Sequence, residues 1–396
     1  MCNIFDKDRK TKYPLLVAEG GKIVNSSGYI GMNVGDDIRG KGEQFADEIE
    51  LRFISDFERK DPENLDKMVH VSTFCVTGGL ICMTYYANTK DPAEDPNNQT
   101  ARFAYAPVSD PSQKVFLDLQ TTGDQIGDKT VDMVYDTILM QNSPDNIYCM
   151  WAARTSDGNY YRFYCPFNVR TKTLGEIRTN RFRVKNIEND FSVSGIKEAF
   201  AENRIPVKKM YSDIGIMQKL SMRVEKGEKW YYSGMYSGDF NCIIKSQDLI
   251  TWEYVSQPDF INESKWENAV YVWNNRCYYF VRQQDGTPGG FLTYYNLNNG
   301  RWANPVIVED CQSRGDFINY MGGLYLFHAP IDREHIGILQ INTDDLNRSK
   351  EIVQAHMHTS CFYPFVQYYQ NGELAMSYTV GRKHIRLSRF DFSKYI

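Results

Sequence analysis

Apolar and polar residues alternate along this chain in a pattern that recurs six times. Each copy has an apolar run, a turn rich in Gly or Asn, and a second run rich in aromatic residues. The copies begin at Val69, Val134, Asp213, Glu267, Ser313 and Phe362. Because Gly and Asn tolerate positive φ, such turns reverse the chain, and each copy predicts a β-hairpin.

A third run with alternating apolar residues follows each hairpin. These runs begin at Arg102, Tyr160, Asn241, Gly290, His335 and His384. The last four turns, marked by Glu228, Asn275, Gly323 and Gly372, are separated by 47, 48 and 49 residues. Repeats of this length with three or four short strands are typical of propeller blades. The pattern predicts an all-β chain, a six-bladed β-propeller of four-stranded antiparallel blades, as a single domain over residues 1–396.

The longer spacing in the first half predicts loop insertions between blades. The segment from Ser194 to Arg204, SGIKEAFAENR, has the pattern of one short capped helix. Near the N-terminus, ELRFIS from Glu50 to Ser55 reads as a strand. We expect it to join the last blade as an outer strand and to close the ring, which removes an exposed sheet edge.

The aromatic content favours strands, and the net charge argues against one class of partner. The 396 residues include 27 Tyr, 22 Phe and 6 Trp, which favour pleated surfaces. A net charge of -5 gives no basic field for a phosphate backbone, so nucleic acid is not an expected partner. No run approaches the roughly 18 apolar residues of a membrane span, and the first residues lack a signal-peptide core. Location stays open between the cytoplasm and a secreted or periplasmic form whose leader has been removed.

Cysteine and histidine positions argue against a metal or a disulfide framework. Nine cysteines are an odd number, and six of them lie inside apolar strand patterns, which predicts buried free thiols. The histidines are too scattered for a metal cluster, at positions His70, His328, His335, His356, His358 and His384. We therefore expect no metal and no redox cofactor.

One short motif points to a family. The segment SQDLITW, Ser246 to Trp252, resembles the Asp-box of sialidases, S-x-D-x-G-x-T-W, with Leu249 and Ile250 at the x-G positions. In that family the box is a structural turn remote from the chemistry. With the six repeats it makes the whole chain resemble the sialidase-like six-bladed propellers, which include carbohydrate-active hydrolases, related lyases and binding proteins.

Hairpin geometry predicts which side chains share one rim. In an antiparallel hairpin the start of the first strand and the end of the second lie at the same end. Strand starts carry His70, Asp136, Asp213, Glu267, Arg314 and Tyr363. Strand ends carry Tyr86, Arg154, Tyr236, Arg282, His328 and Tyr378, with Arg382 just beyond. A functional rim explains this set, although a water-filled central channel would explain part of it.

The resemblance suggests roles for four of these residues. Sialidases use a tyrosine of the last blade as nucleophile, activated by a glutamate of a middle blade, and Tyr363 and Glu267 match these positions. Arginines hold the substrate carboxylate in bidentate pairs, for which a planar guanidinium is suited. Arg282 and Arg314 match these arginines.

Two departures from the family, the missing arginine motif of the first blade and the missing or degraded remaining Asp-boxes, keep other chemistry open. The arginine motif R-I-P of the first blade is absent, and His70 begins the matching strand. His70 and Tyr363 facing arginines would also suit a lyase that removes the C5 proton of a uronic acid. The family's acid is a loop aspartate after the early blades, where this chain offers Asp91, Glu94 and Asp95.

Our leading hypothesis is an exo-acting glycoside hydrolase that cleaves next to an acidic or heavily hydroxylated sugar. Asp136, Asp213 and Glu267 are the acid and base candidates, since most glycoside hydrolysis uses two carboxyl groups; Tyr363 and His70 complete the catalytic set. The expected glycan-binding residues are Arg154, Arg282, Arg314, Arg382, Tyr86, Tyr236, His328 and Tyr378. A lyase on uronate-containing glycans and a non-catalytic glycan-binding propeller remain as alternatives.

Overall fold

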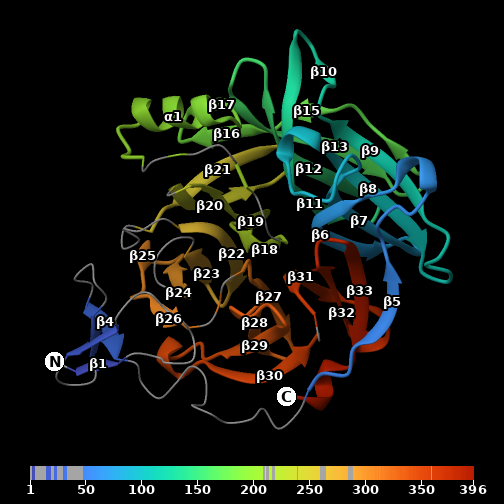
Figure 1. Cartoon of the computed structure of the whole chain (residues 1–396). Helices are drawn as coiled ribbons and strands as arrows, with labels where there is room; N and C mark the ends of the chain where they lie inside the picture. Colours follow the sequence, from blue (N-terminus) through green and yellow to red (C-terminus); the bar gives the residue numbers. More distant parts are fainter. Residues whose placement is uncertain are drawn as a thin grey trace.

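Six small sheets surround a common axis in the computed structural model, and Figure 1 looks along that axis. The structure describes residues 48–207, 210, 214–215, 219–238, 240–258, 265–283, 289–309, 311, 313–357 and 359–396, and four strands within residues 1–47. The chain is all-β, and in its described residues α1 (Val193–Glu202) is the one α-helix. The prediction of a six-bladed β-propeller is confirmed.

Blades 1 and 2 come first along the chain. Blade 1 has the strand order β6-β7-β8-β9, and blade 2 has β10-β11-β12-β13-β14 with β15 also paired to β13. Their bounds are β6 Met68–Thr77, β7 Leu80–Asn88, β8 Gln99–Pro107, β9 Val115–Thr121, β10 Gln125–Ile126, β11 Lys129–Ser143, β12 Asn146–Thr155, β13 Tyr160–Asn168, β14 Thr173–Leu174 and β15 Arg178–Thr179. The short 3-10 helix η1, Pro62–Asn64, precedes blade 1, and η2, Pro96–Asn98, lies between β7 and β8.

Blades 3 and 4, like blade 2, have more than four strands. Blade 3 has the order β18-β19-β20-β21-β16-β17, in which β16 pairs with β21 in parallel, and blade 4 has β22-β23-β24-β25 with β26 on β24. Their bounds are β16 Arg181–Val184, β17 Ile187–Asp190, β18 Ser221–Glu225, β19 Glu228–Ser237, β20 Phe240–Ser246, β21 Thr251–Ser256, β22 Lys265–Trp273, β23 Arg276–Gln283, β24 Gly290–Asn296, β25 Arg301–Trp302 and β26 Val306–Val308.

Blades 5 and 6 complete the ring. Blade 5 has the order β27-β28-β29-β30, and blade 6 has β31-β32-β33-β5. Their bounds are β27 Asp316–Tyr320, β28 Gly323–His328, β29 His335–Ile341, β30 Lys350–His356, β31 Cys361–Tyr368, β32 Leu374–Val380, β33 His384–Phe390 and β5 Arg52–Asp56. Three 3-10 helices, η3 Leu346–Arg348, η4 Gln370–Gly372 and η5 Phe392–Lys394, lie at their ends.

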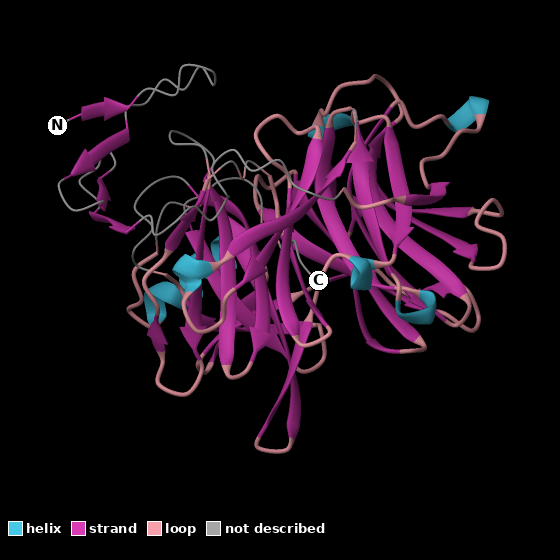
Figure 2. Ribbon diagram, turned by 90° about the horizontal axis from the view of Figure 1, so that it is seen from below, coloured by secondary structure: helices cyan, strands magenta, loops and turns pink. Residues whose placement is uncertain are grey.

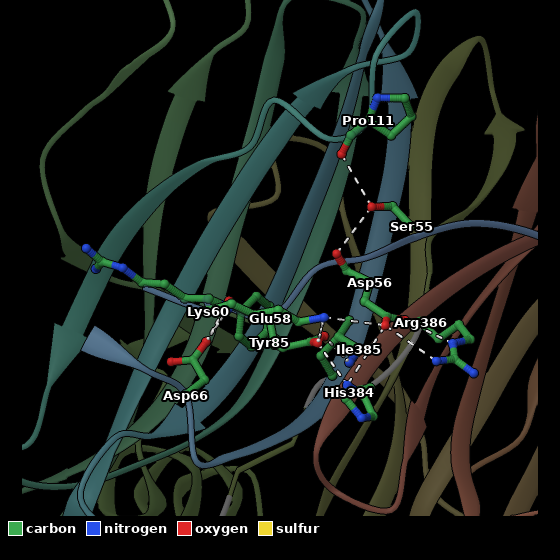
Figure 3. Close-up of polar contacts among 11 residues, drawn as sticks. Ser55, Asp56, Glu58, Lys60, Asp66, Tyr85, Pro111, His384, Ile385 and Arg386 are labelled. Carbon is green, nitrogen blue, oxygen red and sulfur yellow. Dashed lines mark hydrogen bonds and ion pairs between the residues drawn. The ribbon is translucent and has the colours of Figure 1, made fainter. Parts of the chain in front are cut away.

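The ring closes between β5, which precedes blade 1 in the chain, and the last blade, as predicted. β5 pairs antiparallel with β33, so a strand from before blade 1 becomes the outer strand of blade 6. Arg386 donates from Nε to Oδ1 of Asp56 at 2.9 Å, and the Ile385 amide donates to Oε2 of Glu58 at 3.0 Å (Figure 3). Backbone pairing and charged contacts therefore join the first and last segments of the propeller.

The N-terminal segment forms a separate sheet beside the ring. Its order is β1-β2-β3-β4, with bounds β1 Cys2–Ile4, β2 Leu15–Ala18, β3 Lys22–Val24 and β4 Ile30–Asn33. β4 contacts β26 of blade 4, and Figures 1 and 2 place this sheet at the outer edge of the propeller. The repeat pattern did not predict these strands.

Local sequence explains the hairpins. Tight turns place two successive residues at positive φ, as at Gly78 with Gly79 and at Asn274 with Asn275. Blade 3 differs from the prediction, since β18 begins at Ser221 rather than near Asp213, which lies outside the described residues. The predicted helix is confirmed as α1, whose Ser192 cap accepts from the Gly195 amide at 3.0 Å.

The apolar core lies in the spaces between neighbouring blades. Trp151 fills the space between blades 1 and 2, Trp252 that between blades 2 and 3, and Phe327 that between blades 5 and 6. The eight described cysteines are buried and free, as predicted. Within the described residues, no helix has the length and apolarity to cross a membrane.

Candidate functional site

Four blades have an irregular backbone in the strand that begins their main hairpin, namely β6, β11, β22 and β31. Each strand pairing there skips residues, between His70 and Thr73, Tyr135 and Ile138, Lys265 and Asn268, and Phe362 and Phe365. Inside three of these bulges Val71, Asp136 and Tyr363 have φ of 54°, 50° and 57°. Left-handed backbone at non-glycine residues is strained, and bulges redirect side chains. The repeated device turns side chains of several blades toward the ring centre.

Tyr363 and Glu267 meet at this centre. The Tyr363 hydroxyl donates to Oε1 of Glu267, and Nη1 of Arg282 donates to Oε2 of the same carboxylate at 2.7 Å. Burial and the Glu267 charge raise the pKa of Tyr363 well above its usual value, so the phenol keeps its proton. A neutral phenol, a carboxylate and a guanidinium therefore form one buried chain.

Arg314 lies beside this chain with hydrogen-bonding capacity left over. Its guanidinium stands 5.1 Å from the centre of the Tyr363 ring, and the residue is fully buried. Nη2 approaches the Ser72 carbonyl at 3.5 Å, whereas Nε and Nη1 find no acceptor among the described residues. Nε of Arg282 also lacks one there. Buried donors without acceptors are costly, so both arginines have the character of an anion site.

Asp136 forms a second tyrosine and carboxyl pair. The Tyr236 hydroxyl donates to Oδ2 of Asp136, and Arg162 holds the Asp136 carbonyl through Nη1 at 2.8 Å. Burial, with a smaller effect of the Glu267 charge, raises the pKa of Asp136 to about 6 despite the opposing effects of Tyr236 and Arg162. A Cβ at Gly215 would lie 1.7 Å from the Tyr236 ring, so glycine is needed there for the ring to fit.

His70 is enclosed by aromatic rings and arginine charge. Its ring lies 4.5 Å from that of Tyr363 and 5.8 Å from that of Tyr86, both edge to face. Nδ1 and the Thr379 hydroxyl are 3.1 Å apart, and Nε2 has no partner among the described residues. Burial, followed by the charges of the neighbouring arginines, lowers the pKa of His70 well below its usual value. The imidazole is neutral at neutral pH.

Only one of the three predicted loop acids faces the site. Glu94 accepts from the Tyr86 hydroxyl at 2.5 Å and pairs with Nη2 of Arg382 at 2.8 Å. Asp91 instead accepts the Ala93 amide at 2.8 Å, and Asp95 accepts the Asn97 amide at the start of η2. Those two carboxylates stabilise the loop itself.

The remaining predicted residues lie elsewhere. Arg154 is 3.5 Å from Asp132, and the Tyr378 hydroxyl is 3.1 Å from that of Ser388 in the core between blades 5 and 6. His328 is buried against Gly337, where a Cβ would come within 2.6 Å of its Nε2. The side chains of Arg154, Tyr378 and His328 therefore contact other residues than Tyr363 and Glu267. Asp213 lies outside the described residues.

Three residues that the rim argument missed contribute to the site. Arg162 donates to the Asp136 carbonyl. Arg333 contacts the Phe362 ring, and the charges of Arg282 and Tyr363 act on it. A signal for Arg333 exists in the sequence: Arg333-Glu-His and Arg382-Lys-His precede the third strands of blades 5 and 6 in the same way. Repeat alignment of loops, as well as of strand ends, would have found it.

One group of possible metal ligands among the described residues lies at the ring closure. Ligand atoms of Asp56, Glu58 and His384 lie within 4.8 Å of one another. Lys60 pairs with Glu58 at 2.9 Å and Arg386 pairs with Asp56 (Figure 3). Both carboxylates therefore already form ion pairs with basic side chains. The contacts indicate a structural role in closure.

Fold and box together define a sialidase-like six-bladed propeller. Ser246 to Trp252 lies where β20 turns into β21, and Oδ1 of Asp248 accepts the Ile250 and Thr251 amides at 2.8 Å each. No family model and no curated protein matches the chain.

Solved structures match over most of the propeller. Trypanosoma rangeli sialidase in complex with sialic acid aligns at TM-score 0.55 and 11% identity, over 86% of this chain and 57% of that one. A Hadza microbial sialidase aligns at TM-score 0.60 and 11% identity, over 86% and 68%. The NanB sialidase from Streptococcus pneumoniae aligns at TM-score 0.54 and 9% identity, over 87% and 71%. The chain spans little more than half the length of the trypanosomal enzyme. At identities this low, the structural match shows a shared fold and nothing more.

Proposed function

We propose that this protein is a glycoside hydrolase that removes an acidic sugar from the end of a glycan. The observation that carries the proposal is the buried chain in which Tyr363 donates to Glu267 and Glu267 accepts from Arg282. A nucleophile in contact with its base, and a base oriented by a third group, is the general arrangement of covalent catalysis. The sialidase-like fold supports the same reaction class.

The first step uses Tyr363 and Glu267. Glu267 accepts the phenol proton while the Tyr363 oxygen attacks the anomeric carbon, giving a glycosyl-enzyme intermediate that water hydrolyses. A neutral phenol suits this step because a carboxylate nucleophile would repel the carboxylate of the sugar. The N–H groups of Arg282 and Arg314 that have no acceptor among the described residues supply charge-assisted hydrogen bonds to that carboxylate, each worth about 1.5 to 3 kcal/mol.

Asp136 is the acid in this scheme. A pKa of about 6 leaves it protonated in a mildly acidic medium, so it can donate to the departing glycosidic oxygen. Glu94 is instead engaged by the Tyr86 hydroxyl and by Arg382, so its carboxylate already has two partners. Tyr236 then acts as a positioning residue for Asp136.

A lyase on uronate-containing glycans is the second candidate, and His70 is the observation that favours it. Its imidazole is neutral, lies 4.5 Å from the Tyr363 ring, and has Nε2 without a partner in the described residues. A neutral imidazole can remove the C5 proton while Arg314 neutralises the carboxylate and Tyr363 protonates the leaving oxygen. The two reactions leave different products.

Product analysis on a panel of acidic substrates tests the proposal. The panel contains methylumbelliferyl glycosides of sialic, ketodeoxynonulosonic and glucuronic acids, together with uronate oligosaccharides. A hydrolase releases umbelliferone or reducing ends, and a lyase product absorbs near 235 nm through its new double bond. Release of a free acidic sugar that Glu267→Gln abolishes is the expected result. Unsaturated products would establish the lyase instead, and saturable binding without either product would establish a glycan-binding propeller.

A further inference from the structure

A lysine and an aspartate from different blades form a buried ion pair near the ring axis. Lys219 lies two residues before β18 of blade 3, and Asp316 begins β27 of blade 5. Both strands are the ones nearest the axis in their blades (Figure 1). Nζ of Lys219 lies 2.9 Å from Oδ2 of Asp316, and both side chains are buried. Burying two charges is costly even when they are paired, so stability alone does not account for this pair.

The ion pair holds both backbone polar groups of one residue in blade 6. Oδ2 of Asp316 accepts the Val366 amide at 2.7 Å, and Nζ of Lys219 donates to the Val366 carbonyl. Nζ also lies 5.3 Å from the centre of the Phe365 ring. Val366 belongs to β31, which pairs with β32 on one side only. Charged side chains from blades 3 and 5 therefore satisfy the backbone at the inner edge of β31.

Blade order shows how far the lysine reaches. Blades 3 and 6 are three positions apart in a ring of six, so Lys219 extends across the axis to β31. Asp316 comes from blade 5, which is adjacent to blade 6. Three blades are thus joined at Val366 by buried charge-assisted hydrogen bonds, which are stronger than bonds between neutral groups.

Val366 and Asp316 each lie close in sequence to a residue of the candidate site. Val366 is three residues after Tyr363 and directly follows the β31 bulge, in which Tyr363 has φ of 57°. Asp316 is two residues after Arg314, whose guanidinium stands 5.1 Å from the centre of the Tyr363 ring. The bond between Asp316 and Val366 therefore fixes the segment that carries the tyrosine against the segment that carries the arginine. Left-handed backbone at a tyrosine persists only where its surroundings hold it.

The arginine segment is packed too tightly to move. Arg314 and Asp316 are fully buried. A Cβ at Gly315, between them, would lie 2.8 Å from Cδ1 of Leu326 and 3.3 Å from the Phe327 carbonyl. Glycine therefore lets this backbone lie directly on β28. The β31 bulge is the side of the contact that would shift if the bonds to Val366 were lost.

We propose that Lys219 and Asp316 are positioning residues, which hold the β31 bulge so that Tyr363 stays on Glu267 and beside Arg314. Neither residue touches the reacting atoms in this scheme, and both act through the backbone of Val366. The expected effect on turnover rests on the proposed function. The expected effect on the position of Tyr363 does not, because a crystal structure measures it directly.

Two replacements of Asp316 separate positioning from charge balance. Asp316→Asn and Asp316→Leu both leave Lys219 without a counter-charge, but only leucine lacks an acceptor for the Val366 amide. In crystals of Asp316→Leu we expect the Tyr363 hydroxyl to lie beyond hydrogen-bond distance of Glu267, whereas in Asp316→Asn it should stay. We expect kcat on the acidic glycoside that the wild type cleaves to fall by at least about 10²-fold in Asp316→Leu and by less than about tenfold in Asp316→Asn.

Asp66 in blade 1 provides a matched control. It accepts the Arg59 amide at 2.8 Å and pairs with the buried Arg102, as Asp316 does with Val366 and Lys219. Asp66→Leu should lower the midpoint of thermal unfolding and keep kcat close to that of the wild type. If Asp316→Leu does not fold, the double variant Lys219→Met with Asp316→Leu replaces it, because this protein has no unpaired charge at the axis and still lacks both bonds to Val366.

The outcomes are distinct for the inference and for the proposed function. Equal kcat in the two Asp316 variants, or Tyr363 still bonded to Glu267 in the leucine variant, would overturn the positioning role. A loss of kcat in Asp66→Leu as large as that in Asp316→Leu would do the same, since it would reflect stability. Displacement of Tyr363 in crystals of a protein that cleaves no acidic glycan would refute the proposed hydrolysis and leave the positioning role standing.

Discussion

The Tyr363 hydroxyl donates to Oε1 of Glu267, although the two residues belong to blades 6 and 4 and are 96 positions apart in the chain. Blade 5 separates their strands in sequence, so the contact depends on closure of the whole ring. Both residues lie in bulges of first strands, and the Tyr363 bulge has left-handed backbone. An irregular strand at each end of this hydrogen bond, with left-handed backbone at Tyr363, is typical of a functional site.

Replacing Glu267 with glutamine should abolish turnover. The amide keeps the size and an acceptor for Tyr363 but cannot take its proton, so we expect kcat to fall by about 10² to 10⁴-fold. Circular dichroism and thermal unfolding verify that the variant is folded. A matched control exists in blade 3, where Glu225 accepts from Tyr232 and Lys245 outside the site. Glu225→Gln should keep near-native turnover, and equal losses in both variants would indicate a general effect on stability.

Tyr363→Phe should reduce kcat by at least about 10³-fold if the phenol is the nucleophile. The ring contacts with His70 and Arg314 remain in the phenylalanine variant, so the fold should survive. A loss of less than tenfold would limit the tyrosine to positioning substrate, and a two-carboxylate reaction by Asp136 and Glu267 would replace the covalent scheme. Rapid-mixing experiments that detect a burst of the first product in the wild type provide the second measurement.

The pH dependence of activity should follow Asp136. Its pKa of about 6 in the folded protein predicts that kcat/KM falls as pH rises through about 6, because the acid loses its proton. Asp136→Asn should remove this limb and lower activity throughout. The loss should be much smaller for a methylumbelliferyl glycoside than for a natural glycan, since a good leaving group needs less protonation. A pH limb that survives in Asp136→Asn assigns the acid to another residue.

Stability should respond to the same carboxyl group. A folded-state pKa above the usual 3.8 means that the fold binds this proton more tightly than the unfolded chain does. The contribution is therefore complete below about pH 4 and is lost as pH rises to about 6. Between these limits the free energy of unfolding of Asp136→Asn should rise, relative to the wild type, by on the order of 3 kcal/mol. Urea titrations at several pH values measure this, and a pH-independent difference would contradict the shift.

Strand periodicity predicted the fold because each blade repeats the same local chemistry. Hairpin turns at Gly79 and Asn275 and the closing strand near Arg52 follow from positive φ and alternating burial, which are visible in sequence. The N-terminal sheet β1 to β4 has no repeat partner, and the pattern missed it. The number of blades and the closing strand can therefore be predicted from the sequence, whereas strands outside the repeat cannot.

The rim argument brought together those residues whose position strand ends alone decide, and their role stays a prediction. Glu267, Tyr363 and Arg282 met because bulges and blade register bring these ends together. Register also explains Tyr378, which lies near the end of β32 but points into the core toward Ser388. The alternation of side chains across a strand decides which face each end serves, and a bulge shifts that alternation by one residue. Sequence shows neither the bulge nor its extent.

Asp248→Ala should lower stability and spare catalysis. The carboxylate accepts the Ile250 and Thr251 amides and the Ser246 hydroxyl, all within the β20 to β21 turn. Loss of these contacts should cost on the order of 1 to 2 kcal/mol in urea unfolding. Asp248→Asn, which keeps one acceptor oxygen, should cost less. Turnover per folded molecule should be unchanged, and a selective loss of kcat would contradict a purely structural role.

His70→Gln distinguishes the two proposed reactions within one protein. In the hydrolase scheme His70 only packs against Tyr363 and approaches Thr379, so kcat should stay within tenfold of the wild type. In the lyase scheme it removes the proton, and kcat should fall by at least about 10²-fold, the lower range for a general base.

The lowered pKa of His70 adds a second criterion, because a base with this shift stays neutral and active at pH values where an ordinary histidine is protonated. A lyase using His70 would therefore keep its rate well below pH 6.5. Thr379→Val, which removes only the hydroxyl beside Nδ1, is the matched control and should weaken a His70 base by orienting it less well while leaving hydrolysis unchanged. Loss of hydrolysis in His70→Gln, with Tyr363 and Glu267 intact and the protein folded, would place the imidazole in the hydrolytic step and require a revised mechanism.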